Sequence, residues 1–359
     1  MSFAFQAQGS LPNCALMIAA SGKSFRIKVM YSVSNQINIQ HGDARLSFDG
    51  DPASSLLDQL LANKAPVSYS CRRGDCGQCG VKLLEGEAAA LDKGRPLWQM
   101  GSLLTCNAVA CSPLSLRIPY IPELEGIRVL RSPAKVQGLE LLGSDVMQLT
   151  LRLPPANRIA FLPGQFVRLT NSEGTLRSYS LSAGPQPDGM LRMHIRRVEK
   201  GAFSDWLFAR AVIGDLLQLE GPQGHFFQRE NRSVDRSVFL ATGTGIAPVY
   251  AILAAASEKQ RAALGEVWVY WGNRFRKDAY LAEQLADLSL QRGMRLTLVF
   301  SREEDTGHVQ DHMRRDHAAL DGAQVFACGN PAMIEGARTQ ALAAGLGEDF
   351  FYSDSFTAS

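Results

Sequence analysis

Three cysteines stand close together in one glycine-rich segment, and they are Cys71, Cys76 and Cys79. Four and two residues separate them, a spacing typical of a [2Fe–2S] cluster whose fourth thiolate comes from further along the chain. Thiolates converge on a small cluster only if the chain curls tightly, and Gly74, Gly77 and Gly80 permit the positive φ values that such a loop needs. A zinc site or a disulfide pair is the alternative, but zinc usually shows two separated cysteine pairs. The segment therefore predicts three iron ligands.

The fourth ligand has two candidates, Cys106 and Cys111. The segment Leu103–Ala108 resembles the L-x-C-x-A stretch that supplies the last ligand in plant-type ferredoxins, which favours Cys106. Cys111 precedes a short apolar strand and fits better as a small buried hydrophobic residue. Cys14 has no evident partner, and Cys328 belongs to a different motif.

The composition is that of an ordinary globular protein, with 46% hydrophobic and 20% charged residues. A chain of 359 residues implies two or three domains, and its net charge of +2 gives no basis for nucleic-acid binding. No run reaches the ~18–20 apolar residues of a membrane span. Seven cysteines, most of them expected as iron thiolates, fit a reducing cytoplasm. Residues 1–36 form an extension without assignment, whose apolar run 11–20 lacks the basic flank of a signal peptide.

Residues 37–119 read as one small α+β domain around the cysteine loop. The pattern predicts, in order, a strand at 37–39, a turn at Gly42-Asp43, a strand at 44–48, a helix at 54–62 and a strand at 81–84. The buried face of the helix should carry Leu56, Leu57, Leu60 and Leu61. This order resembles the β-grasp ferredoxin domain, and residues 120–126, with their prolines and glycine, form the expected linker.

Residues 127–231 change to short strands separated by proline and glycine turns. The expected strands are 127–130, 146–153, 165–170, 177–181, 191–198 and 216–220. Turns are expected at Pro154-Pro155, Pro163-Gly164, Pro185 and Gly221-Pro222. Many short strands with such turns favour a closed antiparallel barrel.

Residues 232–359 alternate buried strands with helices. Strands are expected at 238–241, 267–271, 296–300 and 324–327, with a helix over 249–263 after the first of them. This alternation predicts a parallel sheet with helices on both faces. The chain is therefore expected to be multidomain, with an α+β domain, an antiparallel β-barrel and an α/β domain.

The barrel strand Arg177–Ser180 carries Arg177 and Tyr179 on one face and Ser178 and Ser180 on the other. A guanidinium suits a pyrophosphate and an aromatic ring suits a flat cofactor, although such a pair is often plain surface. Further on, Ser204 stands where a helix begins, and it can cap that helix or favour a phosphate there.

The α/β domain has its own nucleotide signals at the carboxyl ends of two strands. The segment 243–248 reads GTGIAP, follows a buried strand and opens a helix, which is where open α/β sheets bind nucleotides. Its glycines let the backbone approach a pyrophosphate. Cys328 and Gly329 end a later strand of the same sheet, where the plain alternative is a buried structural cysteine.

Residues 127–356 resemble the ferredoxin–NADP⁺ reductase superfamily, in which R-x-Y-S and G-x-x-S hold a flavin. The resemblance assigns FAD binding to Arg177, Tyr179, Ser180, Gly201, Ser204 and Phe356. It assigns NAD(P) binding to Gly243, Thr244, Gly245, Ala247, Pro248, Ser301, Arg302, Cys328 and Gly329. It makes Ser180, Cys328 and Asp354 the catalytic candidates, with the Cys328 thiol beside the nicotinamide and Phe356 covering the flavin.

These parts together imply an electron path from NADH or NADPH through FAD and the [2Fe–2S] cluster to a protein acceptor. Segments such as Tyr270-Trp271-Gly272 and Phe351–Asp354 are similar to those of CDP-6-deoxy-Δ3,4-glucoseen reductases, which donate to a pyridoxamine-phosphate, iron–sulfur sugar dehydrase. The alternative is the reductase component of a ring-hydroxylating or related oxygenase. A third reading, an iron–sulfur redox sensor, fits poorly with complete flavin and nucleotide motifs.

The nucleotide signals conflict at one turn. Ser301 and Arg302 resemble the pair that holds the 2′-phosphate of NADPH in related reductases, but Glu303, Glu304 and Asp305 would repel a phosphate there. Because sugar-deoxygenation and oxygenase reductases commonly use NADH, the resemblance favours NADH with some tolerance of NADPH.

Overall fold

The computed structural model describes residues 35–69, 71–74, 76–99, 101–230, 232–303 and 307–356. Cys14 and most of the predicted extension lie outside these residues, as do Glu304 and Asp305. The described residues form two compact units, the first from those up to Val67 together with those of Arg72–Tyr120, and the second from those of Ser68–Cys71 together with those after Tyr120. No helix in the described part of the chain is both long and apolar enough to span a bilayer.

The first unit contains a mixed sheet with strand order β2-β1-β8-β3-β6-β5 and a small sheet of β4 and β7. Its elements are β1 (Asn35–His41), β2 (Ala44–Gly50), α1 (Leu56–Ala62), β3 (Gly80–Glu85), β4 (Ala88–Ala90), β5 (Trp98–Gln99), β6 (Ser102–Leu104), β7 (Ala108–Ala110) and β8 (Leu114–Arg117). The first strand pairs in parallel with the last and antiparallel with its hairpin partner. The predicted α+β domain is confirmed, and its first strand begins two residues before the predicted domain boundary.

Helix α1 shows how the sequence sets a local boundary. It begins after Ser55, whose hydroxyl accepts the backbone N–H of Asp58 at 3.1 Å. Its buried leucines are Leu56, Leu57 and Leu60. Leu61 is only half-buried, contrary to expectation, and Gln59 is buried instead because its side-chain amide satisfies the backbone of Asp51.

The second unit begins with a nearly closed antiparallel barrel of strand order β12-β11-β14-β9-β10-β13. The strands are β9 (Leu130–Leu141), β10 (Val146–Arg152), β11 (Phe166–Thr170), β12 (Leu176–Ser180), β13 (Leu191–Arg196) and β14 (Leu216–Gln223). A bridge between Leu181 and Met193 joins the two edge strands, which confirms the predicted barrel. Helix α2 (Ala202–Ala209) packs Phe203 and Leu207 against the barrel core.

Two predictions for the barrel, one of a strand and one of a turn, were wrong, and in both cases a proline lies within the strand concerned. The expected strand at 127–130 is irregular, and the strand starts at Leu130 and continues to Leu141. Pro133 hid this strand, because a proline within a period-two pattern argues against a central strand. Gly221-Pro222 is not a turn but lies inside β14, where the pairing with β11 shifts register and opposes both residues to Val167.

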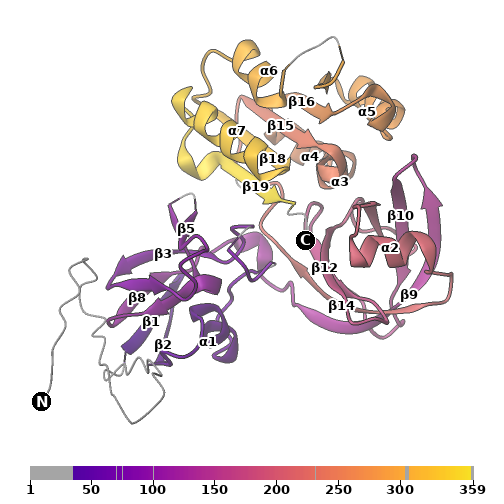
Figure 1. Cartoon of the computed structure of the whole chain (residues 1–359). Helices are drawn as coiled ribbons and strands as arrows, with labels where there is room; N and C mark the ends of the chain where they lie inside the picture. The colour runs from indigo at the N-terminus through magenta and orange to yellow at the C-terminus, as the bar shows by residue number, and fades with distance from the viewer. Residues whose placement is uncertain are drawn as a thin grey trace, which may run out of the picture. The chain divides into compact units, whose positions relative to one another are not determined.

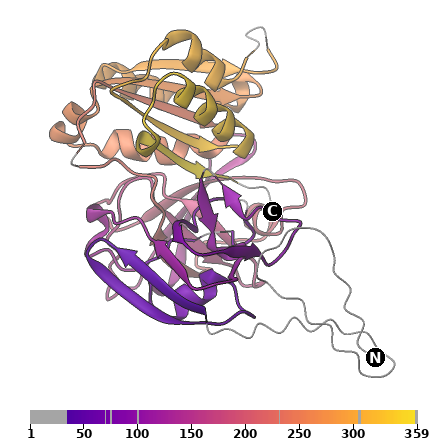
Figure 2. The same cartoon turned by 90° about the vertical axis from the view of Figure 1, so that its left-hand side faces the viewer.

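The second unit ends in a parallel sheet of order β17-β16-β15-β18-β19 with helices on both faces (Figure 1; Figure 2). The strands are β15 (Arg236–Thr242), β16 (Glu266–Asn273), β17 (Arg295–Phe300), β18 (Ala323–Gly329) and β19 (Phe351–Ser355). The helices are α3 (Ile246–Ala255), α4 (Glu258–Ala263), α5 (Ala282–Arg292), α6 (Val309–Asp316) and α7 (Pro331–Ala343). Phe239 lies in the core that includes α3 and α5, and its neighbour Val238 lies in the core that includes α6 and α7. The predicted α/β domain is confirmed.

The single helix predicted over 249–263 is in fact two helices. The first ends at Ala255, and the second starts after Ser257, whose hydroxyl caps the N–H of Gln260. Gln260 returns the contact through its own side chain, which completes a capping box. This local start signal explains why the apolar run does not continue as one helix.

Candidate functional site

Strand pairing in the first unit brings two of the predicted cluster ligands to one end of the sheet. Cys79 directly precedes β3, and Cys106 lies in a short 3-10 helix directly after β6. Gly80 pairs with Leu104 across these strands. The backbone N–H and the hydroxyl of Thr105 both donate to the Cys79 carbonyl, at 3.3 and 2.9 Å. Residues far apart in the sequence are thereby held in adjacent positions.

The backbone of the cysteine loop is tightly curled. Gly74 and Gly77 have φ values of +86° and +73°, as predicted, and Arg72 also adopts a positive φ of +57°. Gly80 does not, contrary to expectation. It is needed for a different reason, because a Cβ there would lie 2.8 Å from the Cβ of Ser102 on the neighbouring strand.

The four predicted ligands, Cys71, Cys76, Cys79 and Cys106, are all thiols rather than disulfide halves. Cys79 and Cys76 are buried, with 3% and 8% of their surfaces exposed, and the other two are half-buried. Within the described residues no three His, Cys, Asp or Glu side chains are placed to hold a single metal ion. A [2Fe–2S] cluster asks for a different arrangement, because four thiolates share two irons. Two buried and two half-buried thiols, three of them on a curled loop, fit that group.

Cys111, the alternative fourth ligand, follows β7 and is half-buried rather than a core residue as expected. Its backbone N–H donates to the carbonyl of Glu87 at 2.8 Å. The resemblance of residues 103–108 to the L-x-C-x-A stretch favoured Cys106 over Cys111, and the pairing of β3 with β6 places Cys106 directly beside the Cys79 segment.

At the carboxyl edge of the parallel sheet, two glycine-containing loops are packed against each other. A Cβ on Gly245 would lie 2.3 Å from the Cys328 carbonyl oxygen. A Cβ on Gly329, whose φ is +131°, would lie 2.2 Å from the hydroxyl of Thr242. The predicted segments at 243–248 and 328–329 therefore form one surface, and no side chain fits between them.

The loop after β15 is a 3-10 helix, Gly243–Gly245, that leads into α3. Its carbonyl at Gly243 accepts the indole N–H of Trp271 at 2.9 Å, which fixes the loop to β16. Thr244 is half-buried, but Ala247 and Pro248 are buried in α3 and support the loop from behind. Backbone amides at the start of a helix suit a pyrophosphate.

A basic side chain that sequence reasoning missed lies at the same loop. Arg196 of β13 comes within 3.8 Å of where a Cβ on Gly243 would be. Its guanidinium also donates to the Asp278 carbonyl at 3.4 Å and pairs with Asp145 at 3.5 Å. On a barrel strand, such an arginine cannot be told from a surface residue by pattern alone.

The three predicted catalytic residues meet at this edge, although they come from three strands. Cys328 of β18 is the register partner of Asp354 on β19. Ser180, the last residue of β12, donates its hydroxyl to the Asp354 carboxylate at 2.9 Å. Cys328 is fully buried and Asp354 is 6% exposed. The contact is made between residues 174 positions apart in the chain.

Burial controls the protonation of this group. It raises the pKa of the Asp354 carboxyl to about 6, and the hydrogen bond from Ser180 offsets only part of that rise. Burial, together with the neighbouring Asp354 charge, also raises the pKa of the Cys328 thiol well above its usual value. Cys328 is therefore a neutral thiol, and Asp354 can exchange a proton near neutral pH.

Among the predicted flavin residues of β12, Ser180 is buried and its hydroxyl is directed to Asp354. The ring of Tyr179 packs at 5.0 Å from that of Phe203 in α2, and burial raises the pKa of its hydroxyl. Arg177 is half-buried, and its guanidinium donates to the Leu176 carbonyl at 2.7 Å.

Ser204 does not cap the helix, contrary to one of its two predicted roles. Helix α2 begins two residues earlier, with Gly201 at the N-cap. The Ser204 hydroxyl is buried, accepts the N–H of Val198 at 3.1 Å and donates to the Gly201 carbonyl at 3.0 Å. It therefore orders the turn that precedes the helix.

Phe356 follows β19 and is half-buried. Its ring packs against the core cluster that contains Trp271 and Cys328, and its N–H donates to the Gly329 carbonyl at 2.8 Å. The end of the described chain is thereby held beside the two loops that are predicted to bind a nucleotide.

At the turn after β17, the carboxylate of Glu303 contacts Arg276. Its carboxylate accepts the Arg276 backbone N–H at 2.7 Å and lies 3.9 Å from the Arg276 guanidinium. Ser301 is tied by its N–H to the Asn273 carbonyl at 3.0 Å, whereas Arg302 is exposed. Part of the acidic character expected of this turn is therefore offset by Arg276.

Three family descriptions match successive parts of the chain. Residues 39–111 match the 2Fe-2S iron-sulfur cluster binding domain, residues 133–228 the oxidoreductase FAD-binding domain, and residues 239–339 the oxidoreductase NAD-binding domain. These ranges coincide with the cysteine loop, the barrel and the parallel sheet, so the chain carries binding domains for a [2Fe–2S] cluster, FAD and a nicotinamide nucleotide.

Whole-length relatives share this order. The CDP-6-deoxy-L-threo-D-glycero-4-hexulose-3-dehydrase reductase of Yersinia pestis is 34% identical over 90% of this chain and 99% of its own. Reductase component 2 of the terephthalate 1,2-dioxygenase of a Comamonas species is 29% identical over 90% of this chain and 98% of its own. The solved structure of the ferredoxin reductase in carbazole 1,9a-dioxygenase superposes with a TM-score of 0.65 at 26% identity, over 90% of this chain and 98% of that one.

The cysteine loop, the antiparallel barrel and the nucleotide edge are thus the three parts that these relatives also combine. The chain belongs to the iron–sulfur flavoprotein reductases of the ferredoxin–NADP⁺ reductase superfamily, and it is an NAD(P)H-dependent reductase that passes electrons to a protein acceptor.

Proposed function

We propose that the protein acceptor is a sugar dehydrase that works on a nucleotide-linked 6-deoxyhexose, so that this chain serves 3-deoxysugar synthesis. The observation that carries this proposal is the 34% identity to a dehydrase reductase over 99% of that relative's length. The oxygenase reductase component named above is 29% identical over a similar share. The second candidate, an oxygenase acceptor, rests on that lower but still full-length similarity.

The division of labour follows the chain. Residues 37–119 would hold the cluster, residues 127–231 the flavin, and residues 232–359 the nucleotide. The proposed cluster ligands are Cys71, Cys76, Cys79 and Cys106. The flavin residues are Arg177, Tyr179, Ser180, Gly201, Ser204 and Phe356, and the nucleotide residues are Gly243, Thr244, Gly245, Ala247, Pro248, Ser301, Arg302, Cys328 and Gly329.

When bound, FAD supplies the conversion of a two-electron hydride into single electrons, which a [2Fe–2S] cluster can carry one at a time. The chain supplies the geometry. Buried Cys328 would lie beside a bound nicotinamide, and its carbonyl, which fills the space that a Gly245 side chain would need, keeps the two loops in contact. The Ser180 hydroxyl orients the Asp354 carboxylate, whose pKa of about 6 lets it hold or release a proton at Oδ2 close to neutral pH.

A direct competition between acceptors tests the proposal. The purified holoenzyme with NADH should reduce a pyridoxamine-phosphate sugar dehydrase at least about tenfold faster than the terminal component of a ring-hydroxylating oxygenase, because specific docking governs transfer between proteins. Faster reduction of the oxygenase component would overturn the dehydrase assignment and support the second candidate.

We also propose NADH as the preferred nucleotide. Arg302 is exposed and would meet a 2′-phosphate at this turn, and Glu303 keeps a carboxylate there although Arg276 contacts it. An acidic side chain at this position suits the 2′-hydroxyl of NADH better than a phosphate dianion.

A further inference from the structure

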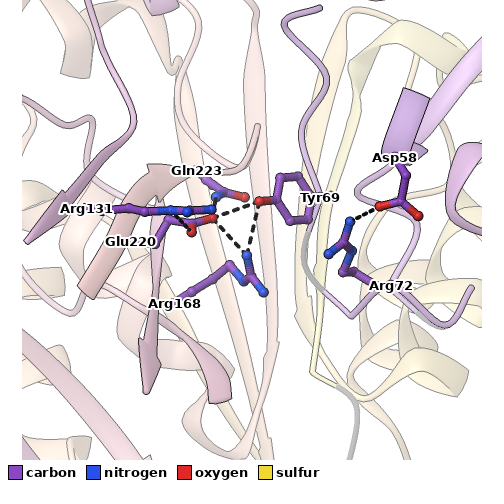
Figure 3. A network of polar contacts seen from close by, with 7 residues as sticks. All are labelled: Asp58, Tyr69, Arg72, Arg131, Arg168, Glu220 and Gln223. Atoms are coloured by element: carbon purple, nitrogen blue, oxygen red, sulfur yellow. Dashed lines mark hydrogen bonds and ion pairs between the residues drawn. The ribbon is translucent and has the colours of Figure 1, made fainter. Parts of the chain in front are cut away.

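A buried polar network surrounds Tyr69, which precedes the first cysteine of the cluster loop by two residues (Figure 3). The Tyr69 hydroxyl donates to the Glu220 carboxylate at 2.8 Å and accepts from the Arg168 guanidinium at 3.1 Å. Arg168 also bonds Glu220 directly at 2.8 Å, so the three side chains close a triangle. The triangle joins the loop segment to strands β11 and β14 of the barrel.

The charges in this triangle are largely removed from water. The side chains of Arg168 and Glu220 are 8% and 15% exposed. Arg131 and Gln223 add further hydrogen bonds to Glu220, at 2.7 and 3.3 Å. A buried ion pair is secure only when its remaining polar atoms are satisfied, and Tyr69 supplies one of the bonds that do so.

The contact extends to the ring and to the neighbouring residue. The guanidinium carbon of Arg168 lies 4.9 Å from the centre of the Tyr69 ring, within the range of a cation–π contact. The Ser68 hydroxyl accepts the backbone N–H of Gly224 at 3.3 Å. Ser68 and Tyr69 are thus attached to the barrel through side-chain, ring and backbone contacts.

These contacts explain why a short segment of the cluster loop belongs to the second unit. Ser68–Cys71 belongs to the second unit, although the chain before it and after it belongs to the first. On the other side of Cys71, Arg72 forms an ion pair with Asp58 of α1 (Figure 3). In the chain, Cys71 therefore lies between two anchored residues. Tyr69 before it is bonded to the barrel, and Arg72 after it is bonded within the first unit.

We propose that Tyr69 is a positioning residue that fastens the Cys71 arm of the cluster loop to the flavin barrel and thereby sets the rate of electron transfer from flavin to cluster. The proposal rests on the proposed assignment of Cys71 as an iron ligand. The transfer would move one electron at a time from a reduced flavin to an oxidised cluster, and no bond of the protein would form or break. Because electron transfer slows steeply with separation, a loosened Cys71 arm costs rate without affecting hydride transfer.

The test compares Tyr69→Phe with Tyr120→Phe in the full-length holoenzyme. The first change removes the hydroxyl from the triangle and keeps the ring over Arg168. The second makes the same chemical change at a tyrosine whose ring instead contacts His41, at 5.4 Å. Two rates are followed after mixing with NADH, the bleaching of the flavin and the reduction of the cluster. Hydrogen exchange of the peptide that contains Tyr69 is measured separately, without nucleotide.

Tyr69→Phe should leave flavin bleaching within about twofold of wild type, slow cluster reduction by about fivefold or more, and speed exchange of the Tyr69 peptide by about tenfold. Tyr120→Phe should change none of these. Glu220→Gln provides a second variant, and it should slow cluster reduction in the same direction because it weakens the same triangle. A general loss of folding would instead slow flavin bleaching as well.

Unchanged cluster reduction in Tyr69→Phe would overturn the proposal, whether or not exchange becomes faster. Unchanged exchange in Tyr69→Phe would overturn it too, because the hydroxyl would then not hold the arm. Failure of the underlying assignment is recognised separately, because Cys71→Ser would then leave the visible spectrum of the cluster unchanged.

Discussion

The hydroxyl of Ser180 donates to the Asp354 carboxylate over 2.9 Å, which joins the last residue of a barrel strand to the last strand of the parallel sheet. Asp354 is in turn the register partner of Cys328. The contact therefore gathers residues from both halves of the second unit at the edge where the nucleotide loops lie.

The raised pKa of Asp354 predicts a specific dependence of stability on pH. Its pKa is about 6 in the folded protein, against an ordinary value of 3.8. Between these values the folded state holds a proton that the unfolded state has lost, so the free energy of unfolding falls as the pH rises from about 4 to about 6. The full effect is about 3 kcal/mol, since one pKa unit is ~1.4 kcal/mol.

Asp354→Asn should remove this contribution, and urea unfolding of both proteins at about pH 4 and about pH 7 measures it. Ser180→Ala provides the matched control, because the lost hydrogen bond normally lowers the pKa of Asp354. It should move the transition to higher pH rather than abolish it. Equal pH slopes in wild type and Asp354→Asn would contradict the burial argument.

The assignment of the fourth cluster ligand gives a second prediction. Cys106→Ser should abolish or strongly alter the visible and paramagnetic spectra of the cluster, because Cys106 lies directly after the strand that pairs beside Cys79. Cys111→Ser replaces the alternative candidate, five residues later, and should leave both spectra intact. The opposite pattern would transfer the ligand role to Cys111.

A third prediction concerns the close packing of the nucleotide loops. Gly245→Ala places a methyl group 2.3 Å from the Cys328 carbonyl, so the backbone must shift. We expect KM for NADH to rise by about tenfold while FAD stays bound, since a small displacement of a binding loop is costly. Gly138→Ala is the control, because a Cβ there meets only an ordinary contact at 3.5 Å. Similar effects from both substitutions would mean that general destabilisation is responsible.

Much of this architecture is readable from local sequence. The cysteine spacing and the GTG segment after a buried strand each predict a short loop, and both loops lie where they were expected. The misses have local causes as well: Pro133 disguised a central strand, and Ser257 started a new helix.

Contacts between distant residues are a different matter. Asp354 was linked to the site only through family resemblance, because nothing near it in the chain points to Ser180. Tyr69 and Glu220 are 151 positions apart, and each looks like an ordinary residue of a loop or a strand. Arg196 likewise lies beside Gly243 only in the folded chain, where the barrel and the parallel sheet are packed together.

Nucleotide preference is the fourth prediction. We expect kcat/KM to be higher for NADH than for NADPH, and Arg302→Ala to leave the NADH value within about twofold, because NADH has no 2′-phosphate to contact. Steady-state kinetics with both nucleotides decide the matter. A value about tenfold higher for NADPH, removed by Arg302→Ala, would show that the exposed cation outweighs Glu303.

The most direct test of the electron path uses the Cys106→Ser protein, which should keep its flavin and lack a working cluster. With NADH, its reduction of ferricyanide should remain close to the wild-type rate, because hydride transfer needs only the barrel and the nucleotide domain. Its delivery of electrons to the proposed dehydrase acceptor should fall by about a hundredfold or more, since no one-electron carrier then links flavin and partner. Undiminished delivery to that acceptor without a cluster would contradict the account.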